Sequence, residues 1–137
     1  MPESPLAKKL KLKPGVRAAV VNAPKNYLDE LKHDSDVSQK LSGKFDWIQV
    51  FAKDKKELAS FARRAASALK PESILWLSFP KGSSKIQTDL TRDKGWKTIL
   101  DLDLKFINLV SVNDMWSAFA LRPYKEGEKR QSFQLGA

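Results

Sequence analysis

The sequence contains no cysteine and only one histidine, His33. Without cysteine the chain has no disulfide framework, no thiolate nucleophile and no zinc site with sulfur ligands. His33 stands in a polar stretch, and the sequence carries no metal-ligand motif. We therefore expect no bound metal or cofactor and assign no catalytic residue. These absences argue against an enzyme without excluding one.

Long apolar segments are missing as well. Runs such as Ile74–Leu77 are far shorter than the roughly 20 residues that cross a bilayer. The first residues contain lysines but no apolar stretch behind them, which argues against a secretory signal. We expect a cytoplasmic protein that does not associate with membranes.

The composition is that of a globular protein, with 42% hydrophobic and 30% charged residues in 137 positions, the size of one domain. The net charge of +9 is concentrated at the ends, since residues 1–25 hold six Lys or Arg against one Glu. We expect a basic lead-in over 1–12, a single α/β domain over 13–123 and a flexible polar tail over 124–137. Basic ends predict only weak, non-specific contact with nucleic acid.

Short apolar segments alternate with helical patterns along the chain. Strands are expected at residues 16–21, 45–51, 74–79, 104–112 and 116–122. The clearest helix begins at Asp54, where Glu57 completes a pattern like a capping box, and ends before Pro71. Residues 33–42 read as a surface loop. The fold class is therefore α/β, with an open mixed sheet of about five strands, mostly parallel, helices on both faces and a terminal hairpin that makes the last strand antiparallel.

Three segments resemble the class I S-adenosylmethionine-dependent methyltransferases. They are Leu12-Lys13-Pro14-Gly15-Val16-Arg17 before the first strand, Phe45-Asp46-Trp47-Ile48, and Leu69-Lys70-Pro71-Glu72-Ser73-Ile74-Leu75. The closing hairpin is characteristic of the same fold. The resemblance spans about residues 12–122 and implies a truncated methyltransferase-like Rossmann-type fold, because residues 27–45 are too few for the second and third strands of that family.

The resemblance fails where the family binds its cofactor. The family has a glycine-rich loop after the first strand, whereas this chain has Asn22-Ala23-Pro24-Lys25-Asn26-Tyr27, with no glycine and with a proline that lacks an amide. The acid that binds ribose has no counterpart if the second strand is missing. We expect no S-adenosylmethionine-dependent methyl transfer. A closer resemblance, to a small family of bacterial proteins without an established activity, covers residues 22–24, 75–81 with Ser84, 88–93 and 114–118.

Ligands of open parallel sheets bind at the carboxyl ends of the strands. The segment from Lys81 towards a helix start at Thr88 or Asp89 is a candidate anion site, because free amides and the helix dipole favour a phosphate or carboxylate there. Asp114 and Trp116 either face the same site or only close the hairpin. The candidate ligand-binding residues are Asn22, Lys81, Ser83, Ser84, Lys85, Thr88, Asp89, Asp114 and Trp116. We expect Asn22, Lys81, Ser84, Asp89, Asp114 and Trp116 to lie on one edge of the sheet, around a shared concavity.

Three functions are compatible with these residues. The leading hypothesis is a non-catalytic α/β domain that binds an anionic small molecule or a protein partner at the carboxyl ends of the strands. The second is a divergent enzyme, either a transferase or one that acts on a phosphorylated substrate. The third is a nucleic-acid-associated protein that uses its basic termini.

Overall fold

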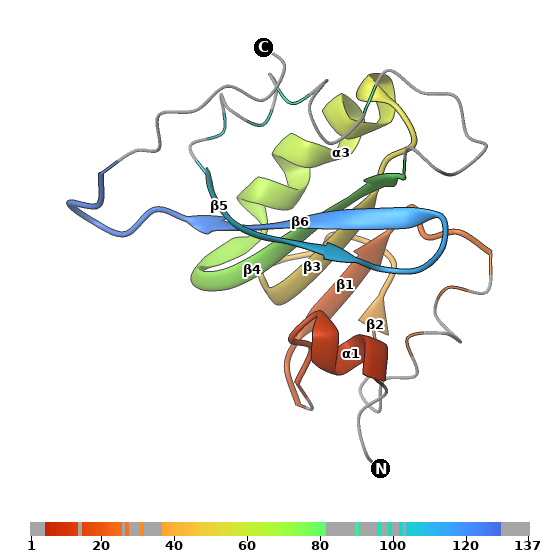
Figure 1. Ribbon diagram of the computed structural model, residues 1–137. Coiled ribbons are helices and arrows are strands. Elements are labelled where there is room, and N and C mark those ends of the chain that lie inside the picture. The colour runs from red at the N-terminus through yellow and green to blue at the C-terminus, as the bar shows by residue number, and fades with distance from the viewer. Residues whose placement is uncertain are drawn as a thin grey trace.

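The computed structural model describes residues 5–13, 15–25, 27, 31, 37–81, 90, 96, 99, 102 and 104–129. Figure 1 shows a twisted sheet with α3 along one face and the short α1 on the other. The elements in chain order are α1 (Pro5–Lys9), β1 (Ala18–Val21), β2 (Val37–Ser38), β3 (Phe45–Phe51), α3 (Lys55–Ser67), β4 (Leu69–Pro80), β5 (Leu104–Ser111) and β6 (Trp116–Pro123). None of the described helices is long and apolar enough to cross a membrane.

The six strands are arranged in the order β2-β1-β3-β4-β6-β5. Strands β2, β1, β3 and β4 pair in parallel, whereas β6 is antiparallel to both of its neighbours, β4 and β5. The expected fold class is confirmed: a mixed, mostly parallel sheet whose antiparallel strand comes from the terminal hairpin.

The strand near residue 37 corrects the sequence analysis in one respect. Residues 33–42 were expected to form a loop, and the second strand was expected to be missing. Instead Val37–Ser38 pairs in parallel with Ala18 and Ala19 of β1, which brings the number of strands to six. Two half-buried residues between polar neighbours are too few to show a hydrophobic pattern in the sequence. The strand therefore depends on its hydrogen bonds to β1 and not on the β propensity of its own residues.

Helix α3 follows the expected pattern at its start. The Asp54 side chain accepts a hydrogen bond from the Glu57 amide at 2.8 Å, and Leu58, Ala62 and Ala65 are its buried face. The helix ends at Ser67, and β4 begins at Leu69, earlier than the expected residue 74. Pro71 therefore lies inside the start of β4 and does not end the helix.

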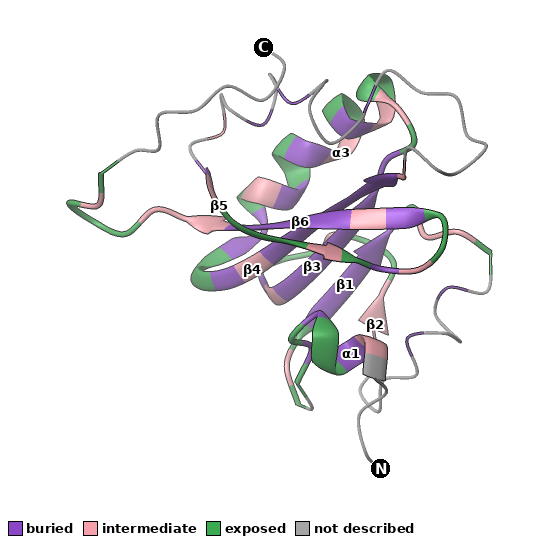
Figure 2. Ribbon diagram, viewed as in Figure 1, coloured by how far each residue is buried: buried purple, intermediate pink, exposed green. Residues whose placement is uncertain are grey.

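Each face of the sheet is covered by its own apolar cluster, and Figure 2 shows the buried strands between the two layers. On one face α3 packs with Leu90, Trp96 and Ile99. Trp96 meets Phe119 edge-on at a ring-centroid distance of 5.0 Å. On the other face Tyr27 and Leu31 pack over the sheet together with residues of the α1 segment, by which we mean α1 and the residues that follow it, 5–13.

The α1 segment is held against the sheet by both packing and hydrogen bonds. Ala7, Leu10 and Leu12 have no exposed surface. The Leu10 carbonyl accepts hydrogen bonds from the indole N–H groups of Trp47 and Trp76, each at 2.8 Å. Ala7, Leu10 and Leu12 therefore belong to the core packing, and the domain boundary at residue 13 stays a prediction.

Residues of the expected tail also contact the sheet. The Glu128 carboxylate accepts hydrogen bonds from Arg122 at 2.7 and 2.9 Å and from Lys105 at 2.8 Å. These bonds, with one from the Lys125 amide, hold the pKa of Glu128 far below its usual value, and Glu128 raises the pKa of Arg122. The first part of the tail, to residue 129, is thereby attached to β5 and β6.

Candidate functional site

The carboxyl ends of β1, β3 and β4 meet at one edge of the sheet. Asn22 follows β1, and Lys81 follows β4. The β5–β6 turn lies at the same edge, because Pro80 pairs with Trp116 and the Lys81 amide donates to the Met115 carbonyl at 2.9 Å. The hairpin turn and the end of β4 therefore share this edge, as the chain order predicts.

Asn22 directly follows β1, in the segment 22–27 that was expected to correspond to the glycine-rich loop of the methyltransferases. Its φ of +61° lies in the left-handed region, which asparagine tolerates better than most residues. Its side-chain amide donates to the Phe51 carbonyl at 2.8 Å and to Glu57 Oε1 at 3.0 Å. Asn22 thus ties the end of β1 to the end of β3 and the start of α3.

A hollow of about 400 Å³ opens beside Asn22. It is lined by Asn22, Lys53, Asp54, Lys56, Glu57, Ser60 and Phe61. The two carboxylates have structural partners: Asp54 caps α3, and Glu57 accepts from Asn22 and from the Lys53 amide at 3.0 Å. Lys53 and Lys56 are exposed at its rim.

Lys81 and Trp116 have structural contacts, and both of them, like Asp114, lie outside the lining of that hollow. The Lys81 ammonium donates to Ser111 Oγ at 2.5 Å. Trp116 is 9% exposed, belongs to an apolar cluster and meets Phe51 edge-on at 5.1 Å. Asp114 is exposed in the turn.

The turn itself is organised by Asn113, which the sequence analysis did not single out. Its side-chain oxygen accepts from the amides of Met115 at 2.9 Å and Trp116 at 3.0 Å. An asparagine at the start of a short hairpin connection is a signal for this arrangement. Asp114 is therefore not needed to close the hairpin.

The remaining candidates, Ser83, Ser84, Lys85, Thr88 and Asp89, lie outside the described residues. The anion-binding loop and the shared concavity that includes Ser84 and Asp89 stay predictions. Within the described part of the chain, no three His, Cys, Asp or Glu residues gather in a way that could hold a metal ion.

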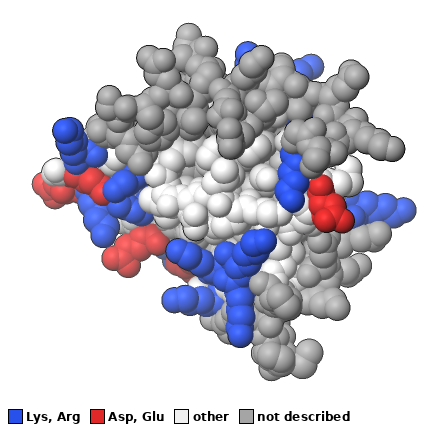
Figure 3. Space-filling model, in the orientation of Figure 1, with Lys and Arg blue, Asp and Glu red and all other residues white. Residues whose placement is uncertain are grey.

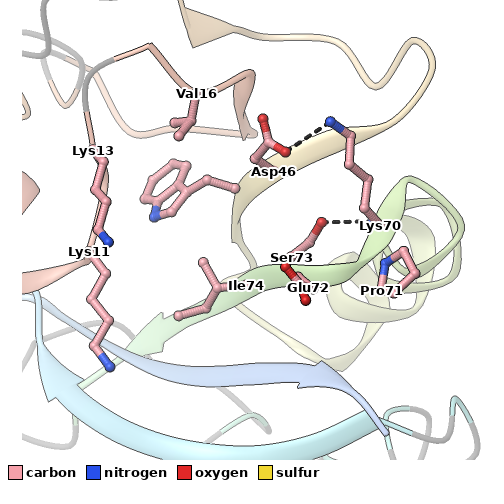
Figure 4. A pocket seen from close by; sticks show the side chains of 10 residues that line it. Lys11, Lys13, Val16, Asp46, Lys70, Pro71, Glu72, Ser73 and Ile74 are labelled. Carbon is pink, nitrogen blue, oxygen red and sulfur yellow. Dashed lines mark hydrogen bonds and ion pairs between the residues drawn. The ribbon is translucent and has the colours of Figure 1, made fainter. Parts of the chain in front are cut away.

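A larger hollow, of about 700 Å³, lies at the opposite, amino edge of the sheet. Figure 4 shows Lys11 and Lys13 on one side of it and Lys70 on the other. Lys70 pairs with Asp46 at 2.9 Å, and this bond, with one from the Arg17 amide, lowers the pKa of Asp46. The signal in the sequence was the alternation of lysine with leucine over residues 9–13, which was interpreted as part of a basic lead-in.

Comparison with solved structures identifies the fold. The chain superposes on a ribosomal-protein methylase from Lactobacillus delbrueckii subsp. bulgaricus with a TM-score of 0.58 and 14% identity, covering 87% of this chain and 76% of that one. It superposes on the magnesium protoporphyrin IX methyltransferase from Synechocystis PCC 6803, with bound SAH, with a TM-score of 0.56 and 10% identity, covering 86% of this chain and 78% of that one. The mitomycin 7-O-methyltransferase matches at 0.52 and 13% identity over 87% of this chain, which spans 45% of that enzyme.

The sequence matches no protein-family model and no curated protein. At identities this low, structural likeness establishes the fold and not the chemistry. The observed strand order, with β6 inserted between β4 and β5, agrees with the likeness. This chain has the truncated methyltransferase-like Rossmann fold.

Proposed function

We propose that this chain is a methyltransferase-fold domain that binds an anionic small molecule at the carboxyl edge of its sheet, without transferring a methyl group from S-adenosylmethionine. The observation that carries the proposal is the Asn22 side chain, which bridges β1, β3 and α3 where the methyltransferases open a glycine-rich loop. The Asn22 amide is thus used inside the chain, at the edge of the sheet where ligands of this fold class bind.

The backbone after β1 supports the loss of the cofactor. Pro24 has no amide to donate, and its carbonyl accepts from the Tyr27 amide at 3.1 Å. Glycine at such a loop lets a ligand approach the backbone, whereas Asn22, Ala23 and Pro24 all carry side-chain atoms. The segment after β1 therefore makes its hydrogen bonds within the chain, as Asn22 and Pro24 show.

The charge at the edge supports an anionic ligand. The lining of the hollow holds two carboxylates and two lysines: Asp54 and Glu57 are half-buried and accept hydrogen bonds from within the chain, whereas Lys53 and Lys56 are exposed. The Lys53 side chain is 61% exposed and its ammonium lies 3.8 Å from Glu57 Oε2, and such an exposed pair contributes little to stability. Lys81 adds a further positive charge at the end of the neighbouring strand.

A thermal-shift screen tests the proposal. The panel contains S-adenosylmethionine, S-adenosylhomocysteine, nucleotides and sugar phosphates. A ligand at 100 times its Kd stabilises the native state by about 2.7 kcal/mol, which a melting curve resolves easily. We expect a phosphorylated compound to raise Tm and S-adenosylmethionine to leave it unchanged.

Matched variants then locate the site. Lys56→Gln should weaken binding of the compound that scores in the screen, whereas Arg63→Gln, which removes the same charge from an exposed position later on α3, should not. Equal affinities for the two variants would place the ligand elsewhere. A micromolar Kd for S-adenosylmethionine in a calorimetric titration would refute the loss of the cofactor.

The likeness to methyltransferases favours a divergent transferase as the second candidate. Such an enzyme would bind S-adenosylmethionine and release S-adenosylhomocysteine in the presence of its acceptor. The same calorimetric titration separates the two candidates, because only the transferase needs the cofactor.

A further inference from the structure

The basic segment before β1 presents its charges from a fixed backbone. Its exposed lysines are Lys8, Lys9, Lys11 and Lys13. Between them Leu10 and Leu12 are fully buried in the cluster that covers this face of the sheet. Figure 3 shows Lys and Arg side chains gathered in the area where α1 and the following segment lie in Figure 1.

Hydrogen bonds restrict this segment further. The Leu10 carbonyl is shared by two indole N–H groups, and the Leu12 amide donates to the Ala7 carbonyl at 2.8 Å. Lys11 has a φ of +59°, a conformation that a residue with a Cβ keeps only where its surroundings hold it. Lysines on an ordered backbone lose less backbone conformational entropy on binding than lysines on a free end.

The hollow at the amino edge extends this basic surface. Lys11, Lys13 and Lys70 contribute three positive charges to its lining, against Asp46 and Glu72. Asp46 is already bonded to the Lys70 ammonium and to a backbone amide. The three lysines exceed the two carboxylates by one charge, and the exposed Lys8 and Lys9 precede Lys11 by three and two positions, which adds two further positive charges to the segment.

We propose that this surface, formed by Lys8, Lys9, Lys11, Lys13 and Lys70, binds the phosphate backbone of a nucleic acid without reading its sequence. The charges are exposed and spread over several residues, which fits successive phosphates along a strand. A site for one small ligand instead has a few polar groups that converge in an enclosed pocket. The proposed binding is independent of the small-molecule site at the carboxyl edge.

The distribution of exposed apolar residues favours nucleic acid over an anionic membrane. A segment that lies in a membrane surface buries large apolar side chains beside its lysines. The exposed large apolar residues of the described chain are Ile107, Leu109 and Met115, on β5 and its turn. The apolar residues between the lysines face the sheet and are not available for insertion.

Fluorescence anisotropy on the full chain tests the proposal, with a labelled single-stranded DNA of about 16 nucleotides, long enough for a non-specific site. If each of the five lysines contacts one phosphate of the single-stranded DNA, log K should fall with log salt with a slope of up to about −3.5, at about −0.7 for each phosphate. We expect binding at about 50 mM salt and its loss at higher salt.

Paired variants identify the surface. Lys11→Gln with Lys13→Gln should lower affinity at least about tenfold at low salt and reduce the slope by about 1.4, as the loss of two phosphate contacts requires. Arg63→Gln with Arg64→Gln removes the same charge from α3, on the other face of the sheet, and should change the affinity less than twofold. If the first pair lowers Tm, its loss of affinity could reflect unfolding. The variant with Lys8→Gln and Lys9→Gln, two exposed positions of the same segment, then tests the same loss of affinity.

Three results would overturn the proposal. One is no binding at low salt up to about 100 μM protein, the weak end of non-specific affinities. Another is an equal loss of affinity in the α3 pair, which would show that only net charge matters. The last is binding to phosphatidylserine vesicles without binding to DNA, which would assign the surface to a membrane.

Discussion

Replacing Leu10 by alanine tests whether the α1 segment belongs to the core. The Leu10 side chain has no exposed surface, and its cluster includes Trp47 and Trp76. Truncating a fully buried leucine to alanine removes its transfer free energy and leaves a cavity, at a cost of about 2–5 kcal/mol. The backbone carbonyl that accepts the two indole hydrogen bonds remains, so the variant isolates the packing contribution.

The expected change is large enough to measure by thermal unfolding. For a chain of 137 residues each kcal/mol corresponds to about 4 °C, so Leu10→Ala should lower Tm by about 8–20 °C. The matched control is Lys9→Ala, an exposed neighbour, which should change the free energy of unfolding by less than about 0.5 kcal/mol. If Leu10→Ala lowers Tm by no more than this control, the segment is not packed on the sheet, and the proposed lysine surface loses its rigid support.

Three further substitutions test individual hydrogen bonds. Tyr27→Phe removes the hydroxyl that donates to Gln49 Oε1 at 2.6 Å in the interior, and urea unfolding should show a loss of about 1–3 kcal/mol; an unchanged midpoint would contradict the bond. Ser73→Ala removes a buried hydroxyl that accepts from one backbone amide and donates to one carbonyl, and should cost a similar amount. Glu128→Gln should lower Tm at neutral pH, because the folded-state pKa of Glu128 is depressed by Arg122 and its bonds stabilise the fold above the ordinary pKa of 4.5. That stabilisation begins to decline as pH falls below 4.5 and is lost only as pH approaches the much lower folded-state pKa, so the difference between the two Tm values should shrink steadily below pH 4.5; a difference that stays constant from pH 7 to pH 3 would refute the assignment.

The strands and α3 could be predicted because their local signals agree with their tertiary environment. An unbroken apolar run marks β1, large apolar residues mark the mostly buried β3, and Asp54 marks the start of α3. The alternation of strand and helix also predicted that β1, β3 and β4 end at the same edge of the sheet. The two-residue β2 has no such signal, since it exists only through pairing with β1.

The edge of the sheet at which Asn22 lies was predictable, but the contacts of Asn22 were not. Chain order puts Asn22 at the carboxyl edge, whereas its bonds to Phe51 and Glu57 depend on the register of β1 against β3, which no local pattern encodes. The packing of the α1 segment on the sheet was not predicted, for a similar reason. Its leucines pack against indoles that follow 37 and 66 positions after Leu10, and the lysines between them look like a solvated end.

The position of β6 has a consequence for synthesis of the chain on the ribosome. Strand β5 leaves the ribosome before β6, yet β6 occupies the place between β4 and β5. Until β6 emerges, β5 has no neighbour with which to form sheet hydrogen bonds, and the edge of β4 is open to other chains. The nascent protein can thus assemble its parallel half early, but completes its sheet only when the last strand inserts between two that are already made.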